Sequence, residues 1–151
     1  MVPTQSQPFV SAGPALDLPG ALNRDALIRA FRIMYLARSL DDREILLKRQ
    51  NRIFFQISGA GHEAVGTAAG MLLKAGHDWV FPYYRDRALT LTLGVSAEDM
   101  LLQAVGAGSD PSSGGRQMLS HWSSPALRIF TGSSPTATQF LQAAGCAEGK
   151  N

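Results

Sequence analysis

The sequence predicts a mostly helical chain with at most two short strands. Apolar residues recur at three- and four-residue steps through several stretches, which is typical of amphipathic helices. Turn-forming residues separate these stretches, and only two segments have the length and the β-branched or aromatic content of a strand. Because two short strands are not a stable layer by themselves, either the chain is a small helical domain or further strands complete its sheet.

A long helix is predicted over about 22–50. Its apolar positions follow helical spacing, and Asn23 is a suitable N-cap. We expect a bend or a change of the buried face near Asp41 and Asp42. The following segment, 52–58, is short, β-branched and aromatic, so it is predicted to be an extended segment or a short strand.

Three more helices are predicted in the middle of the chain. The first covers 62–74 and is rich in small residues, which allow another backbone to approach closely. A short helix is expected over 85–94. Ser96 and Asp99 form a near capping box, so the third helix should start there and end near Gly106.

The last part of the chain predicts a loop, a short strand and a final helix. Residues 107–117 are rich in Gly, Ser, Asp and Pro and should form a loop, and 127–130 is a candidate for a short extended piece, at most a second short strand. Because proline favours the first turn of a helix, the last helix should run from Pro135 to Glu148, with Ser134 as a possible N-cap.

Composition excludes several classes of protein. The 151 residues correspond to about one domain, and 45% hydrophobic content with a single cysteine excludes a disordered chain and a disulfide scaffold. No apolar run approaches the ~18–20 residues of a membrane span, and no secretory signal precedes the helices. Residues 1–20, with four prolines, are predicted to be an irregular arm. Cys146 fits a reducing compartment, so we expect a cytoplasmic location.

The charge pattern argues against binding to nucleic acid or to a membrane. The formal net charge is only +2, and arginines alternate with acidic residues along the predicted long helix. Eleven of the 14 basic residues are arginine, the residue that is best suited to bidentate contact with carboxylate or phosphate.

Three groups of residues are candidates for chemistry. A tyrosine hydroxyl beside an arginine fork in 83–86 can hold a phosphate, although a packed aromatic pair with a surface Arg–Asp pair explains these residues too. The hydroxyls of 133–139 suit an anion or an alkali-metal ion at a helix start, or ordinary capping. His121 follows a polar loop of the kind that covers active sites, or it is simply structural. There is no P-loop, zinc spacing or nucleophile elbow.

Five motifs in series resemble one enzyme family. They are Arg49-Gln50-Asn51-Arg52-Ile53, Gly61-His62-Glu63-Ala64, Phe81-Pro82-Tyr83-Tyr84-Arg85-Asp86, Gly115-Arg116-Gln117-Met118 and Ser133-Ser134-Pro135-Thr136-Ala137-Thr138-Gln139. In this order they resemble the α part of the thiamine-diphosphate-dependent 2-oxo acid dehydrogenases, the decarboxylating first components of multienzyme complexes. The branched-chain, or 2-oxoisovalerate, type is the most similar. The resemblance runs from about Leu27 to Glu148.

The resemblance implies an α/β thiamine-diphosphate-binding fold, of which residues 21–151 would be the N-terminal portion. It also implies a role for single residues. Tyr84 and Arg85 would bind the diphosphate, Ser134 and Thr136 would contact the cofactor, and His121 on the substrate-channel loop would be a candidate catalytic residue. A structural potassium ion would be held by Ser133, Pro135, Thr138 and Gln139.

The implied activity is the oxidative decarboxylation of a branched-chain 2-oxo acid, with transfer of the acyl group to a lipoyl group on a partner acyltransferase. An α2β2-type assembly with a β part, fused or separate, is implied as well. The Mg²⁺ ligands of the family are expected beyond residue 151, so the chain alone is expected to be inactive. Two other hypotheses stay open, a truncated non-catalytic relative that pairs with other subunits and a small helical binding domain.

Overall fold

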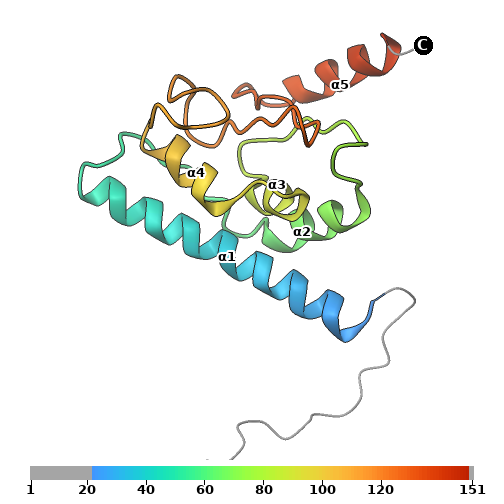
Figure 1. Ribbon diagram of the computed structural model, residues 1–151, viewed down its shortest axis with the longest axis horizontal. Helices are drawn as coiled ribbons and strands as arrows, with labels where there is room; N and C mark the ends of the chain where they lie inside the picture. The colour runs from blue at the N-terminus through green and yellow to red at the C-terminus, as the bar shows by residue number, and fades with distance from the viewer. Residues whose placement is uncertain (1–21, 150–151) are drawn as a thin grey trace, which may run out of the picture.

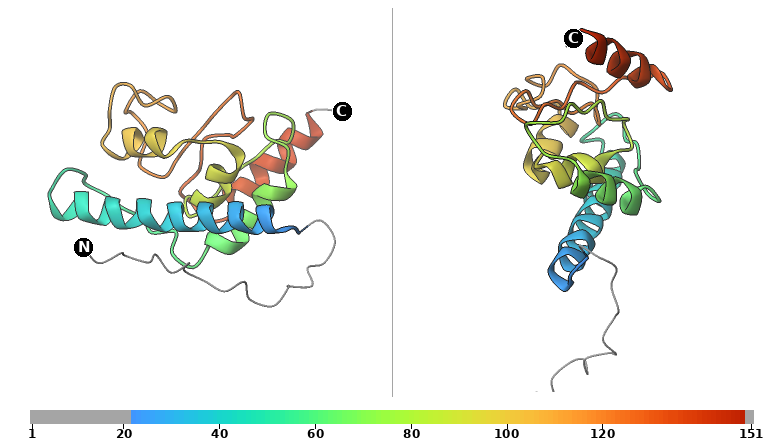
Figure 2. Two further views of the ribbon diagram at one scale, coloured as in Figure 1. Left: turned by 60° about the horizontal axis from the view of Figure 1, so that its bottom comes forward. Right: turned by 90° about the vertical axis from the view of Figure 1, so that its right-hand side faces the viewer.

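The computed structural model describes residues 22–149, which form five helices and no strand. The helices are α1 (Arg24–Arg49), α2 (Glu63–Leu72), α3 (Arg87–Leu93), α4 (Ala97–Ala104) and α5 (Thr138–Glu148). The long helix α1 runs beside α2, α3 and α4, while α5 stands apart beyond the connecting loops (Figures 1 and 2). None of the described helices is long and apolar enough to cross a membrane. The predicted arm, 1–20, lies outside the described residues.

Helix α1 confirms the predicted long helix but not the bend. Asn23 is the N-cap, and its Oδ1 accepts a hydrogen bond from the backbone N–H of Ala26 at 2.8 Å. The helix continues without interruption through Asp41 and Asp42. It keeps one buried face at helical spacing, and Asp41 lies on that face because its carboxylate has partners inside the molecule. The buried residues are Ala37, Leu40, Asp41 and Glu44.

Helices α2 and α3 approach each other through glycines, as the small residues of α2 predict. A Cβ atom on Gly66 would lie 3.0 Å from the backbone nitrogen of Leu89. On Gly70 it would lie 2.5 Å from the Cβ atom of Thr92, a distance at which something must shift. The two helices therefore pack with their backbones close together. This contact fixes the position of α3 and of the loop that precedes it.

The main hydrophobic core lies between these helices and the loop that follows α4. Its largest buried side chains are Trp122 and Met100, and α1 contributes Leu40. A smaller cluster of Ile53 and Leu119, with Ala104 of α4, closes the other end. The loop after α4 is therefore anchored by apolar side chains although it has no regular secondary structure.

Within the described residues, the strand alternative is wrong for both segments that could have been strands. In 52–58 the backbone bonds to side chains of α1 instead of to a neighbouring strand: Lys48 Nζ donates to the Phe54 carbonyl oxygen at 2.8 Å. The Phe54 side chain is 94% exposed, so the apolar residues of this segment do not share a covered face. Segment 127–130 forms only isolated bridges, in which Ile129 pairs with Val80 and with Ser124.

Helix α4 confirms the predicted capping box, because Ser96 and Asp99 exchange side-chain and backbone hydrogen bonds. The predicted start of the last helix at Pro135 is wrong. Helix α5 begins at Thr138, after Ala137 in the left-handed conformation with φ 69°. Ser134 is not the cap, because Ala137 occupies the N-cap position, and the Ser134 hydroxyl bonds to His121 instead.

Candidate functional site

An open cavity of about 550 Å³ brings two of the predicted cofactor residues together. Tyr84 reaches it from the loop before α3, and Ser134 reaches it from the loop before α5. The rest of the lining is apolar and comes from Phe55, Ile57 and Met118. A cavity with apolar walls and a few polar groups is the usual form of a small-molecule site.

Tyr84 belongs to a cluster of two tyrosines and one arginine. Arg85 Nη1 donates to the hydroxyl oxygens of Tyr83 at 2.8 Å and Tyr84 at 3.2 Å. Its guanidinium carbon lies 5.0 Å from the centroid of the Tyr84 ring. The hydrogen bond from Tyr83, followed by the positive charge of Arg85, lowers the pKa of the Tyr84 hydroxyl. The cluster thus places a cation and two hydroxyls beside the cavity.

Asp86 does not form the surface ion pair that was the alternative explanation of this motif. Its Oδ2 accepts a hydrogen bond from the backbone N–H of Tyr83 at 2.9 Å and thereby closes the turn before α3. Burial raises the pKa of Asp86, and the Tyr83 N–H opposes this shift. The packed aromatic pair of that alternative is present, with the two tyrosine ring centroids 3.9 Å apart.

His121 is buried, only 3% exposed, and reaches the cavity through Ser134. Its Nδ1 lies 2.9 Å from the carbonyl oxygen of Leu119, so Nδ1 carries the proton that this acceptor requires. In the neutral ring Nε2 then accepts a hydrogen bond from the Ser134 hydroxyl at 2.7 Å. The backbone N–H of His121 donates to the Gln103 side chain at 3.1 Å, which fixes the loop to α4. A proton acceptor therefore lies one hydroxyl away from the cavity.

The predicted potassium residues come together only in part. Thr138 Oγ1 donates to the hydroxyl oxygen of Ser133 at 2.7 Å and approaches the carbonyl oxygen of Pro135 at 3.0 Å. Gln139 makes none of these contacts. Thr136 is exposed and does not line the cavity. Among residues 22–149, no three His, Cys, Asp or Glu side chains form a group that could hold a metal ion.

Sequence reasoning missed a buried ion cluster behind the cavity. Arg87, the first residue of α3, contacts Glu44 and Asp41 of α1, and all three side chains are buried. The available signal was the spacing of the two acidic residues, which continue the buried stripe of Ala37 and Leu40. An acidic residue in an apolar stripe requires an internal partner, and this requirement predicts a buried cation.

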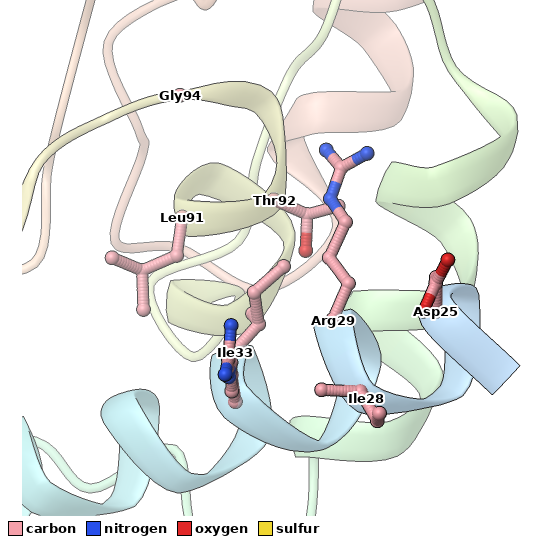
Figure 3. Close-up of a pocket in the computed structure, with 8 residues that line it drawn as sticks. Asp25, Ile28, Arg29, Ile33, Leu91, Thr92 and Gly94 are labelled. Atoms are coloured by element: carbon pink, nitrogen blue, oxygen red, sulfur yellow. The ribbon is translucent and has the colours of Figure 1, made fainter.

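A second cavity, of about 540 Å³, lies between the start of α1 and the end of α3 (Figure 3). In this view Arg29 extends from α1 past Thr92 of α3, and Ile28 and Leu91 form apolar parts of the lining. The cavity contains none of the residues that the motifs single out. Tyr84, Ser134 and their neighbours therefore define the candidate site.

Comparisons with known proteins agree with the motifs. Residues 31–150 match the family model of the dehydrogenase E1 component. The 2-oxoisovalerate dehydrogenase subunit alpha of Bacillus subtilis is 44% identical over 117 residues, which are 78% of this chain and 36% of that protein. The subunit alpha of Pseudomonas aeruginosa is 35% identical over 124 residues, 82% of this chain and 30% of that protein. The human mitochondrial subunit alpha is 32% identical over 128 residues, which are 83% of this chain and 28% of that protein.

The chain spans about a third of the length of the curated relatives that it matches. The family match nevertheless covers most of its residues, and it includes the segments that carry Tyr84, Arg85, His121 and Ser134. The chain belongs to the dehydrogenase E1 component family.

Proposed function

We propose that the chain is part of the α subunit of a thiamine-diphosphate-dependent branched-chain 2-oxo acid dehydrogenase, and that its open cavity receives the cofactor. The observation that carries this proposal is the meeting of Tyr84 with its Arg85 neighbour and Ser134 at one cavity. The three relatives described above are all named as 2-oxoisovalerate dehydrogenase alpha subunits, which supports the branched-chain type.

The polar side of the cavity fits a diphosphate. Arg85 uses only Nη1 for the two tyrosines, so its other nitrogens have no hydrogen-bond acceptor among residues 22–149. Phosphate oxygens are suitable acceptors for an arginine fork, and the Tyr84 hydroxyl can add a further hydrogen bond. The apolar lining of Phe55, Ile57 and Met118 fits the flat rings of thiamine.

Bound thiamine diphosphate would supply the carbon nucleophile and the electron sink for decarboxylation. This chain's residues would orient the cofactor and hold a proton near it. The Ser134 hydroxyl donates a hydrogen bond to Nε2 of His121. The oxygen of Ser134 therefore keeps a lone pair directed away from the ring. We assign His121 and Ser134 as a polar pair where the 2-oxo acid enters the cavity. We assign Thr136 as a residue whose backbone contacts the cofactor.

Metal ions belong to the proposal. Oxygens of Ser133, Pro135, Thr138 and Gln139 would hold a potassium ion, and the first three already lie near one another through the hydrogen bonds of Thr138. Hard oxygen ligands suit such an ion. Mg²⁺ on the diphosphate would take its ligands from other parts of the whole protein.

The remaining partners follow from the proposed reaction. The acyl group would pass to the lipoyl group of an acyltransferase, and a β part would complete an α2β2-type assembly. The complete subunit would have an α/β fold, to which these helices would contribute one part. A cytoplasmic location agrees with the single thiol of Cys146.

Calorimetry with thiamine diphosphate and Mg²⁺ tests the proposal on a protein that carries this chain. We expect Arg85→Ala to weaken binding by about 2–5 kcal/mol, because a charged hydrogen-bond donor is lost from the site. Arg43→Ala is the matched control, since Arg43 is exposed on α1 and lines no part of this cavity. Equal affinity of the Arg85 variant and the unchanged protein would reject the assignment.

A further inference from the structure

Arg87 is the centre of the buried ion cluster behind the cavity. It is only 2% exposed, and its guanidinium forms a two-pronged contact with Glu44 of α1. Nη1 donates to Oε1 at 2.8 Å, and Nη2 donates to Oε2 at 2.6 Å. Nη2 also lies 3.2 Å from Oδ1 of Asp41. None of these three side chains lines the candidate site, so their burial requires another explanation.

Stability alone does not explain the cluster. Two carboxylates and one cation lose their hydration here, and apolar residues of similar volume are often equally stable or more stable. Burial raises the pKa of Glu44 although the hydrogen bonds and charge of Arg87 oppose the shift. Arg87 Nε has no hydrogen-bond partner. A cluster with these costs is better explained by the geometry that it imposes on its surroundings.

One arm of the cluster reaches the wall that carries Ile57. Asp41 Oδ2 accepts hydrogen bonds from the Ser58 hydroxyl and the Gly59 backbone N–H, both at 2.8 Å. Gly59 in turn packs against the backbone of Arg85, because a Cβ atom on Gly59 would lie 3.0 Å from the Arg85 carbonyl oxygen. Asp41 thus holds the Ile57 wall and the arginine of the candidate site against each other.

On its other side, the ion cluster contacts Trp122, the residue that follows His121. The guanidinium carbon of Arg87 lies 5.2 Å from the centroid of the Trp122 ring, which is buried and adjacent in sequence to His121. Arg87 also follows Arg85 by two residues, at the start of α3. Arg87 is therefore linked to the Arg85 backbone through Asp41 and Gly59, and to His121 through Trp122.

We propose that Arg87 is a positioning residue, which together with Glu44 and Asp41 fixes the mutual placement of the Ile57 wall, the Tyr84-Arg85 pair and His121. The proposal rests on the proposed function, because it takes this cavity as the site for thiamine diphosphate. Arg87 does not touch the ligand and acts only through these neighbours. Its fork geometry, which lysine lacks, is the property that the role requires.

Two variants separate positioning from stability. Arg87→Lys keeps the charge but loses the two-pronged contact. Glu44→Leu with Arg87→Met replaces the two-pronged ion pair by apolar side chains of similar size, while Asp41 keeps its hydrogen bonds from Ser58 and Gly59, so this variant should lose less stability than Arg87→Met alone. Arg38→Ala is the matched control, because the ion pair of Arg38 with Glu63 at 2.6 Å also joins two helices but lies outside the candidate site.

Two measurements on the full chain then decide between the roles. The first is the calorimetric affinity for thiamine diphosphate with Mg²⁺, which should fall about ten-fold in both Arg87 variants, the usual effect of losing an outer supporting partner. The second is the NMR spectrum of the histidine ring nitrogens, in which His121 should lose its single Nδ1–H form. Arg38→Ala should change neither quantity.

An unchanged His121 spectrum in both Arg87 variants would overturn the proposal, whatever happens to affinity. If the double variant fails to fold, Arg87→Lys decides alone. Failure of a whole protein that carries the unchanged chain to bind thiamine diphosphate would contradict the proposed function, while the His121 spectrum would still test the positioning role. The two ideas can therefore fail separately.

Discussion

The two walls of the cavity are built by different physical means. The wall that carries Tyr84 rests on the layer of α1, α2 and α3, which is held by an apolar core, close glycine contacts and a buried ion cluster. The wall that carries Ser134 belongs to the loops 107–137, where no helix lies between α4 and α5. Buried apolar side chains such as Trp122 anchor these loops in the core, and side-chain hydrogen bonds to the backbone fix their shape in place of regular secondary structure.

Asp110 is the centre of the loop wall. Its carboxylate accepts hydrogen bonds from the Ser113 hydroxyl at 2.6 Å and from the backbone N–H groups of Ser112 at 2.9 Å and Gly115 at 3.4 Å. The Ser112 hydroxyl and the Ser123 backbone bond to each other across the loop. We therefore expect changes in the helical layer to affect global stability, and changes in the loops to affect local order.

The largest effect is expected from Arg87→Met alone. This change leaves the carboxylates of Glu44 and Asp41 buried without their cation, which costs about 3–5 kcal/mol when one partner of a buried pair is removed. Urea denaturation followed by circular dichroism measures the loss. A loss below about 1 kcal/mol would show that water enters the cluster and that the layer is not sealed there.

Close packing of the layer predicts the second effect. Gly70→Ala places a Cβ atom against Thr92, and overpacking of this kind costs about 1–3 kcal/mol. Gly145→Ala in α5 is the control, because no atom lies within 4 Å of its added Cβ and alanine favours a helix by up to about 1 kcal/mol. Thermal melting of both variants should give changes of opposite sign. Equal destabilisation would contradict the close approach of α2 and α3.

Asp110→Ala tests the loop wall. The loss of one acceptor for three donors should cost roughly 1–2 kcal/mol, less than a sealed site because water can reach part of the loop. Hydrogen exchange should speed up over 107–123, while the amides of α2 and α3 keep their protection. Uniform loss of protection across both walls would refute the distinction between them.

The smallest effect is expected at the surface contact between α1 and α2. Burial raises the pKa of Glu63, but hydrogen bonds from its own backbone, from Arg38 and from the Gly61 N–H outweigh burial and lower it overall. A lowered folded pKa means that the ionised side chain stabilises the fold above pH 4.5 and loses this contribution as the pH falls further. Glu63→Gln should therefore remove part of the acid sensitivity seen in melting curves between pH 5 and pH 3. An unchanged pH dependence would show that the pair contributes nothing.

Periodicity and capping residues predict the helical layer well, because these signals are local. Asn23, Ser96 and Asp99 occupy the cap positions that the sequence indicates. The strand alternative for 52–58 fails because its backbone bonds to α1, with the Phe54 carbonyl oxygen accepting from Lys48 and the Arg52 N–H donating to Leu47, and a β-branched, aromatic composition does not reveal these partners. The predicted start of α5 at Pro135 is also wrong. Ser134, the expected cap, bonds instead to His121, a residue from an earlier part of the chain.

The motifs predict which residues belong to the candidate site, but not how these residues are arranged. Tyr84, Arg85 and Ser134 were singled out from their residue types and from the family resemblance; Tyr84 and Ser134 line one cavity, and Arg85 bonds to Tyr84 beside it. That His121 would be buried and linked to the cavity through Ser134 was not visible in the sequence. The role of Arg87 depends on contacts with α1 and Trp122, which only the folded chain brings together.

If the two walls form one diphosphate-binding cavity, a single ligand must affect both of them. Titration of a whole protein that carries this isotope-labelled chain, with thiamine diphosphate and Mg²⁺ and followed by NMR, tests this. We expect the signals of Tyr84, Arg85 and Ser134 to shift together with one dissociation constant. Shifts confined to one wall, or centred on the cavity of Arg29 and Thr92, would contradict it.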